Sequence, residues 1–289
     1  MDGGEMWEFA DGEFGMETSA LAIDPNDTAI IYANARSGII KSVDHGKNWR
    51  WLPGVAPYWG YSIVIDPNNS ATVYAGGEGR VYKSTDGGLN WKIIFEMQNE
   101  NEMQYEKRIK LAIDPRKPSI IYAGACGRHG DDTIFKSTDG GKKWKVINKG
   151  IDDPDYYYEL VDVVVSQHDS NIIYGVFSDH LYKSVNGGKR WKKLAGSPGA
   201  DGNSLHRDTV LTSNPQIIYL HADRGISRSI DGGISWKDVE SGYVQFFVVD
   251  PHNPEIIYAG FDNIIRKSTD GGHTWKLITN GLPNINRDY

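Results

Sequence analysis

The sequence predicts an all-β protein built from repeated four-stranded units, and three observations support this. A nine-residue phrase ending in tryptophan recurs along the 289-residue chain. A second phrase, rich in isoleucine, tyrosine and alanine, precedes each copy, as in Ile121-Tyr122-Ala123-Gly124. No segment carries a sustained apolar period of 3.6 residues with helix caps, so helices should be scarce. The copies of the nine-residue phrase are Lys41–Trp49, Lys83–Trp91, Lys136–Trp144, Lys183–Trp191, Arg228–Trp236 and Lys267–Trp275.

Each copy is a predicted turn between two strands, and we call it the tryptophan hairpin. The aspartate of Asp-Gly-Gly accepts backbone N–H bonds, and the glycines adopt positive φ without steric cost. A serine two residues earlier bonds to the same turn, and the tryptophan begins the next strand and buries its ring. A ring of aspartates could bind metal ions, but the hairpin explains them without one, so no metal or other cofactor is expected. The residues with this structural role are Asp44, Asp86, Asp139, Asn186, Asp231, Asp270, Trp49, Trp91, Trp144, Trp191, Trp236 and Trp275.

The full repeat is longer than the hairpin, because the hairpin tryptophans lie 39 to 53 residues apart. This period matches a four-stranded unit. Six units give about 24 short antiparallel strands, and radial repetition hides the edges of so many strands, which predicts a single β-propeller of six four-stranded blades. In the second unit, strands A to D are expected at about Tyr61–Asp66, Ala71–Gly76, Val81–Ser84 and Asn90–Phe95.

We expect residues 1–289 to form one propeller domain, with repeats at about 18–53, 61–95, 108–148, 160–195, 206–240 and 244–280. Residues 1–17 would be a leading strand and link, and 281–289 a tail. The leading stretch contains Asp2-Gly3-Gly4-Glu5-Met6-Trp7, a seventh copy of the hairpin without its first strand. Six blades are favoured because a missing blade would expose two apolar blade faces to water. A seventh blade that has lost its first three strands is the alternative.

Charge and cysteine content exclude several classes of protein. Lys and Arg number 31 against 38 Asp and Glu, and the net charge of −7 argues against a nucleic-acid-binding protein. The single cysteine, Cys126, permits no internal disulfide and no thiolate metal site. No apolar run approaches the roughly 18 residues of a membrane span, and the acidic start is unlike a signal peptide. We expect a soluble protein without membrane insertion, secreted or periplasmic if the chain is a processed form.

The two repeated phrases together resemble a known family. Ser-x-Asp-x-Gly-x-x-Trp is similar to the Asp-box, also called the bacterial neuraminidase repeat. Its pairing with Ile-Asp-Pro-Asn and Ile-Tyr-Ala-Gly resembles the subgroup of sortilin-type receptor propellers, photosystem II assembly factors and xyloglucan hydrolases. The resemblance covers essentially the whole chain and implies a propeller with Asp-box hairpins between strands C and D. It implies no single function, because related propellers do different work on other loops.

Loop variation locates the predicted working surface. The A→B turns and C→D hairpins should lie on one rim, and the more variable D→A links and B→C loops on the other. Arginines beside aromatic residues on that variable rim are typical of a binding surface. The alternative is that these loops are simply polar and that their tyrosines pack between blades. The predicted ligand-binding residues are Arg36, Arg80, Arg128, Arg224, Tyr58, Trp59, Tyr156, Tyr157 and His206.

Two functions compete for this rim, and binding of a protein segment or oligosaccharide without catalysis is preferred. The alternative is a glycoside hydrolase with two carboxylates about 5–10 Å apart, for which the candidates are Asp153, Asp162 and Asp208. An ion pair with Lys110 of the previous blade is another explanation of Asp162, which lies in an apolar strand. The Phe/Tyr-Arg-Ile-Pro phrase of sialidases and the common hydrolase motifs are absent from the sequence. No oligomeric state is predicted.

Overall fold

A computed structural model describes most of the chain. The residues described are 18–35, 38–53, 62–97, 108–126, 133–151, 160–177, 180–196, 198, 205–211, 214, 216–222, 225–250, 252–261 and 264–278. They form 24 β-strands and contain no α-helix. Within these ranges, no helix is long and apolar enough to cross a membrane.

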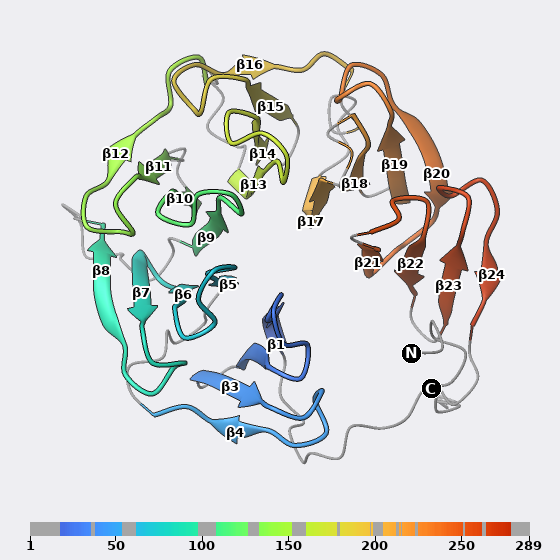
Figure 1. Ribbon diagram of the computed structural model, residues 1–289. Helices are drawn as coiled ribbons and strands as arrows, with labels where there is room; N and C mark the ends of the chain where they lie inside the picture. Colours follow the sequence, from blue (N-terminus) through green and yellow to red (C-terminus); the bar gives the residue numbers. More distant parts are fainter. Residues whose placement is uncertain are drawn as a thin grey trace.

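The strands form six antiparallel sheets of four, and each sheet follows chain order from strand A to strand D. Figure 1 shows the six sheets as blades around a central axis, with the A strands innermost and the D strands outermost. The predicted propeller of six four-stranded blades is confirmed. The strands of the second blade begin and end within two residues of the predicted limits.

The bounds of the strands are as follows. Blades 1 to 3 comprise β1 (Thr18–Ile23), β2 (Ile31–Ala35), β3 (Gly38–Ser42) and β4 (Arg50–Trp51); β5 (Ser62–Ile65), β6 (Val73–Gly76), β7 (Arg80–Ser84) and β8 (Lys92–Glu96); β9 (Arg108–Ile113), β10 (Ile121–Cys126), β11 (Thr133–Ser137) and β12 (Lys145–Val146). Blades 4 to 6 comprise β13 (Leu160–Val165), β14 (Ile173–Phe177), β15 (Leu181–Ser184) and β16 (Lys192–Lys193); β17 (Leu205–Leu211), β18 (Ile218–Ala222), β19 (Gly225–Ser229) and β20 (Lys237–Ser241); β21 (Phe246–Val249), β22 (Ile257–Gly260), β23 (Ile265–Ser268) and β24 (Lys276–Leu277).

The hydrophobic core lies between the blades. Strand β6 is buried along its whole length, because its alternate side chains face the two neighbouring blades. Tyr74 and Val81 of blade 2, for example, belong to one cluster with Ile109 and Ile121 of blade 3. Blade-to-blade packing therefore carries the burial that stabilises the fold.

The tryptophan hairpin has the hydrogen bonds that its sequence predicts. In blade 3, Ser137 Oγ donates to Asp139 Oδ1 at 2.9 Å and accepts from the Gly141 N–H at 2.9 Å. Asp139 Oδ1 also accepts from the Lys143 N–H at 2.9 Å. Gly140 and Gly141 have φ of 72° and 89°, the left-handed conformation that glycine adopts most easily. The other five hairpins repeat the serine bond to the second glycine, at 2.8–2.9 Å.

The prediction for the tryptophans needs two corrections. Strand D begins one residue after the tryptophan, and five of the six rings are only partly buried, because the hairpins lie at the outer edge of the blades. Trp144 Nε1 donates to Gly141 O of its own turn at 3.1 Å. Trp191 is the exception in burial, with 3% of its surface exposed. Trp191 Nε1 and Trp275 Nε1 donate instead to carbonyls of the preceding blade, Ile147 O at 2.5 Å and Val239 O at 2.8 Å.

A cationic side chain links each blade to the next one in the chain. In blade 3, Lys136 Nζ lies 5.1 Å from the centre of the Tyr122 ring and donates to Gly187 O, the first glycine of the next hairpin, at 2.8 Å. Four further links have the same form. They are Lys41 to Gly87 at 3.2 Å, Lys83 to Gly140 at 3.0 Å, Lys183 to Gly232 at 3.0 Å and Arg228 to Gly271 at 3.5 Å.

The first and last blades have more exposed apolar surface than the others. Leu21 of β1 is 59% exposed, whereas Ile63, its counterpart in the register of blade 2, is 6% exposed. Val248 of β21 is 53% exposed, and Tyr258 of β22 is only partly buried, although its counterparts in the other five blades are 0–1% exposed. The predicted count of six blades is correct, and Leu21 and Val248 are exposed apolar side chains on the first and the last of them.

Candidate functional site

The two rims of the propeller have different structures. On one rim, which we call the hairpin rim, each tryptophan hairpin is bonded to the A→B turn of its own blade, as by the Gly140 N–H to Ser119 O at 2.9 Å. On the opposite rim, which we call the loop rim, the D→A links meet the B→C loops. There the Met97 N–H donates to Gly79 O at 2.9 Å, and the Ile109 N–H donates to Gly77 O at 3.1 Å. The predicted division of turns and loops between two rims agrees with these bonds.

Blade 2 supplies the best described part of the loop rim. Arg80 lies at the start of β7 and pairs with Glu96 at the end of β8, with Nη2 2.6 Å and Nε 2.8 Å from Glu96 Oε1. Both side chains are partly open to solvent, at 39% and 47% exposed. The hydrogen bond with Glu96 raises the pKa of Arg80, and burial raises the pKa of the neighbouring Glu78. The guanidinium is thus held by a carboxylate that an acidic ligand would have to replace or join.

A second charged group on the loop rim was not predicted. Arg266 Nη1 of β23 lies 2.9 Å from Glu240 Oε1 of the preceding blade, and its guanidinium carbon lies 4.7 Å from the centre of the Phe261 ring. The Glu240 side chain is 7% exposed, so its charge is balanced mainly by Arg266. One feature of the sequence could have indicated that Arg266 has a special role. Arg266 precedes the hairpin lysine at a position that is occupied in blades 1 to 4 by Ile40, Tyr82, Phe135 and Tyr182.

The catalytic candidates are only partly described. Asp162 is half-buried in β13, and its Oδ1 accepts a hydrogen bond from the Val163 N–H at 2.8 Å. His206 and Asp208 belong to β17, of which the structure describes the backbone alone. The pairing of Asp162 with Lys110 and the presence of two facing carboxylates remain predictions. Within the described ranges, no group of three or more His, Cys, Asp or Glu side chains is placed to hold a metal ion.

Most predicted ligand-binding residues lie outside the described ranges. Among the predicted ligand-binding residues, Arg80 is the one whose side chain the structure describes. The gathering of the arginines on one face with the aromatic residues therefore remains a prediction. The candidates outside the described residues are Arg36, Tyr58, Trp59, Arg128, Asp153, Tyr156, Tyr157 and Arg224.

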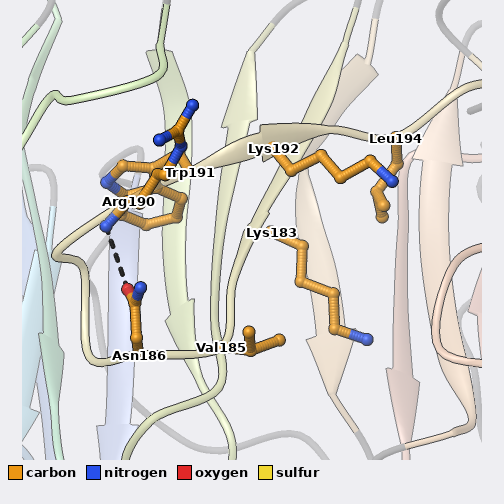
Figure 2. Close-up of a pocket in the computed structure, with 7 residues that line it drawn as sticks. All are labelled: Lys183, Val185, Asn186, Arg190, Trp191, Lys192 and Leu194. Carbon is orange, nitrogen blue, oxygen red and sulfur yellow. Dashed lines mark hydrogen bonds between the residues drawn. The ribbon is translucent and has the colours of Figure 1, made fainter.

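A pocket of about 410 Å³ lies on the outer edge of blade 4 (Figure 2). Lys183 and Lys192 extend in the same direction there, away from Trp191. Cationic side chains line the pocket, and Asn186 stands where the other hairpins have a negatively charged aspartate, a composition that favours an anion. However, Lys183 Nζ already donates to Gly232 O and lies 5.2 Å from the centre of the Tyr174 ring, and burial lowers its pKa. Lys183 therefore belongs to the contact between blades 4 and 5, and we assign no ligand to this pocket.

The order of the strands and the packing of the blades define the chain as a β-propeller. Turns that hydrogen-bond to one another form its hairpin rim, and loops that differ between the blades form its loop rim. Comparison with protein families gives a match to the model described as sortilin, neurotensin receptor 3, over residues 37–180. No curated protein sequence compared with the chain matches it.

Solved structures share the fold at low sequence identity. An ancestral GH74 enzyme superposes with a TM-score of 0.76 and 19% identity over 96% of this chain, which spans 40% of that enzyme. YCF48 from Cyanidioschyzon merolae gives a TM-score of 0.66 and 14% identity, with 96% of this chain and 90% of that chain covered. A structure of YCF48 bound to D1 peptide gives 0.63 and 16%, with 91% and 82% covered. Similarity at this level of identity shows the fold alone.

Proposed function

We propose that the protein is an Asp-box propeller that binds a protein segment on its loop rim, without catalysis. The observation that carries this proposal is the asymmetry between the rims. Repeated turns bonded to one another occupy the hairpin rim, whereas links and loops of different length and composition converge on the loop rim. Variable loops on a rigid scaffold are where propellers and other repeat folds bind their partners. YCF48, a structural neighbour, has been solved with a bound peptide.

The charge of the loop rim indicates the chemistry of the partner. The predicted rim arginines, Arg36, Arg80, Arg128 and Arg224, recur at corresponding B→C loops and would form a ring of guanidinium groups. Arg80 shows that such a group can be positioned by a neighbouring carboxylate and stay partly open to solvent. A segment that carries carboxylates fits this surface, and the aromatic residues of the D→A links would contact its apolar side chains.

A binding assay with matched peptides tests this proposal. The probes are a library of Asp- and Glu-rich peptides and the same peptides with Asn and Gln in place of the acids. We expect Arg80→Glu with Arg128→Glu to weaken binding of acidic peptides at least about tenfold, and binding by the unaltered protein to weaken with added salt. The matched control is Lys189→Glu with Arg190→Glu, an equal change of charge at the hairpin of blade 4. Equal binding by the two double variants would contradict the proposal.

Glycoside hydrolysis is the second candidate, and the structural similarity to the GH74 enzyme favours it. It would use two of Asp153, Asp162 and Asp208 as acid and base or as acid and nucleophile. Release of reducing ends from xyloglucan, abolished by Asp162→Asn and kept in the Lys189→Glu/Arg190→Glu variant, would establish this function. Absence of hydrolysis together with peptide binding would leave the binding function.

A further inference from the structure

Arg266 stands at a position where the fold does not require a charge. The residue directly before the linking cation of strand C is apolar or aromatic in blades 1 to 4. In blades 1 and 2 this residue, Ile40 or Tyr82, is only 4% exposed, whereas 39% of the Arg266 side chain is exposed. Apolar packing therefore satisfies the fold at this position, and the arginine in blade 6 needs another explanation.

The contact of Arg266 within its own blade has an aromatic counterpart in blade 4. The guanidinium carbon of Arg266 lies 4.7 Å from the centre of the Phe261 ring. The corresponding residues of blade 4, Tyr182 and Phe177, pack edge to face with their ring centres 5.2 Å apart. The guanidinium thus takes the place of a tyrosine ring on the corresponding phenylalanine, a contact that is favourable for a planar cation.

The contact of Arg266 with the preceding blade also has an aromatic counterpart. Arg266 Nη1 lies 2.9 Å from Glu240 Oε1. The corresponding residues of blades 2 and 3 are Phe95 and Phe135, whose ring centres lie 4.8 Å apart. Strands β8 and β20, which carry Phe95 and Glu240, are both five residues long, and both have a register shift against strand C. The backbone therefore follows a similar course at the two interfaces, and an ion pair replaces an aromatic pair.

Stability gives no reason for this replacement. The Glu240 side chain is only 7% exposed, and removing a carboxylate from water costs free energy that its ion-pair partner only partly returns. Replacing a buried ion pair by apolar side chains of similar volume is often neutral or stabilising. The pair is better explained by the guanidinium that it holds at the surface.

The guanidinium of Arg266 is held at one nitrogen and on one face, and one of its edges is open. Glu240 bonds to Nη1, and the Phe261 ring covers one face. Within the described part of the chain, Nε and Nη2 of Arg266 donate to no protein group. These two atoms form the edge that binds a carboxylate through two parallel hydrogen bonds. The arrangement therefore suits a carboxylate that approaches from solvent.

The three side chains lie on the loop rim, in the outer half of the blades. Arg266 is the second residue of β23, Phe261 directly follows β22, and Glu240 is the second-last residue of β20. Figure 1 shows β20 and β23 away from the central axis, on the outer side of blades 5 and 6. Tyr243, in the link that joins these two blades, is 73% exposed. Arginine and tyrosine are typical of the residues that contribute most to the binding of a protein partner.

We propose that Arg266 binds an aspartate or glutamate side chain of the protein segment, at the junction of blades 5 and 6. Glu240 and Phe261 are positioning residues, because they hold the guanidinium and Glu240 is itself buried. Binding forms two charge-assisted hydrogen bonds and leaves the bond to Glu240 intact. The inference rests on the proposed function, and it extends the binding surface from the B→C loop arginines to the outer half of the loop rim.

Exchange of the ion pair for its aromatic counterpart tests this proposal. Glu240→Phe with Arg266→Phe reproduces the pair formed by Phe95 and Phe135, and it leaves the net charge of the protein unchanged. The probe is the Asp- and Glu-rich peptide that the unaltered protein binds most tightly, with the matched Asn and Gln peptide as control. We expect Tm to stay the same or rise, and Kd for the acidic peptide to increase at least about tenfold.

Arg266→Lys separates the shape of the guanidinium from its charge. Lysine keeps a positive charge beside Glu240 but lacks the planar fork, so we expect Kd to rise at least about threefold while Tm changes little. Binding by Arg266→Lys equal to that of the unaltered protein would overturn the proposal, even if the double variant failed to fold.

Comparison with the Arg80→Glu/Arg128→Glu variant separates this inference from the proposed function. If that variant loses binding while Glu240→Phe/Arg266→Phe keeps it, Arg266 is not a ligand contact and the proposed function stands. If the unaltered protein binds no acidic peptide, the proposed function fails and this inference fails with it.

Discussion

At the scale of single residues, the tryptophan hairpin depends on hydrogen-bond acceptors more than on charge. Asn186 takes the place of the aspartate in blade 4, and its Oδ1 still accepts the Arg190 N–H at 2.9 Å and the Ser184 hydroxyl at 3.0 Å. The serine is the central group, because its hydroxyl satisfies a buried glycine N–H and donates to the aspartate. This role was predicted from the spacing of Ser, Asp and Gly, since those residue types have few other uses in a tight turn.

Ser137→Ala should therefore lower the free energy of unfolding by about 1–3 kcal/mol, the cost of leaving the buried Gly141 N–H without an acceptor. Urea unfolding followed by tryptophan fluorescence measures the change. Val146→Ala, at a side chain 59% exposed in the same blade, is the control and should change the free energy by less than about 0.5 kcal/mol. An equal loss in both variants would show that the serine hydrogen bond contributes no more to the free energy of unfolding than an exposed side chain does.

At the scale of strands and blades, the sequence predicted local structure better than contacts between units. The strand limits of blade 2 follow from turn chemistry, which acts over a few residues. The link from Lys136 through Tyr122 to Gly187 was missed, although all three residues recur, because it joins positions 51 residues apart. Arg266 and Glu240 were missed for the same reason. Trp144 was expected to be buried, but its position at the outer edge of a blade cannot be read from the hairpin alone.

Lys136→Met keeps the length of the side chain but removes its charge and its hydrogen bonds. We expect the free energy of unfolding to fall by about 1–3 kcal/mol, through loss of the charge-assisted bond to Gly187 O and of the contact with the Tyr122 ring. Thermal and urea unfolding measure the loss. Lys145→Met, at an exposed position of β12, serves as the matched control. A Lys136→Met variant no less stable than the control would mean that the blades hold together by apolar packing alone.

At the scale of the whole molecule, the hairpin aspartates determine the pH range over which the protein loses stability in acid. Bonds from the backbone and side chain of Asn48 hold the pKa of Asp44 at about 2, and bonds from Asn90 do the same for Asp86. The pKa values of Asp231 and Asp270 are also about 2, chiefly through the hydroxyls of Ser235 and Thr274. The pKa of Asp139 is lowered as well, mainly by the Lys143 N–H.

These carboxylates have a lower pKa in the folded protein than the usual value of 3.8, so their ionised form stabilises the fold. The contribution is fully present above about pH 4 and is lost as the pH falls through the folded-state pKa of about 2. We expect Tm to be steady down to about pH 4 and to fall as the pH drops from about 4 to 2. Asp86→Asn should lower Tm at neutral pH and make the fall shallower, since one titrating group is gone. A Tm that stays constant down to pH 2 would contradict this account.

A candidate site on the loop rim is harder to predict from sequence than the fold. Repetition identifies the residues that every blade needs, but a binding surface is made from the positions at which the blades differ. Arg80 was predicted as a ligand-binding residue because arginine recurs at corresponding loops, and that role stays a prediction. Its ion pair with Glu96 was not predicted, because no other unit repeats the glutamate. A single chain gives no measure of which unrepeated residues are functional.

Among the residues that the structure describes, the five cationic links join consecutive blades. Interactions of this kind make the chain a one-dimensional array, in which each unit is stabilised by its two neighbours. Local opening should then begin at the ends of the array and spread inward. Amide protons of β2 and β22 should exchange with solvent sooner than those of β10 and β14, although all four are strand B of their blades.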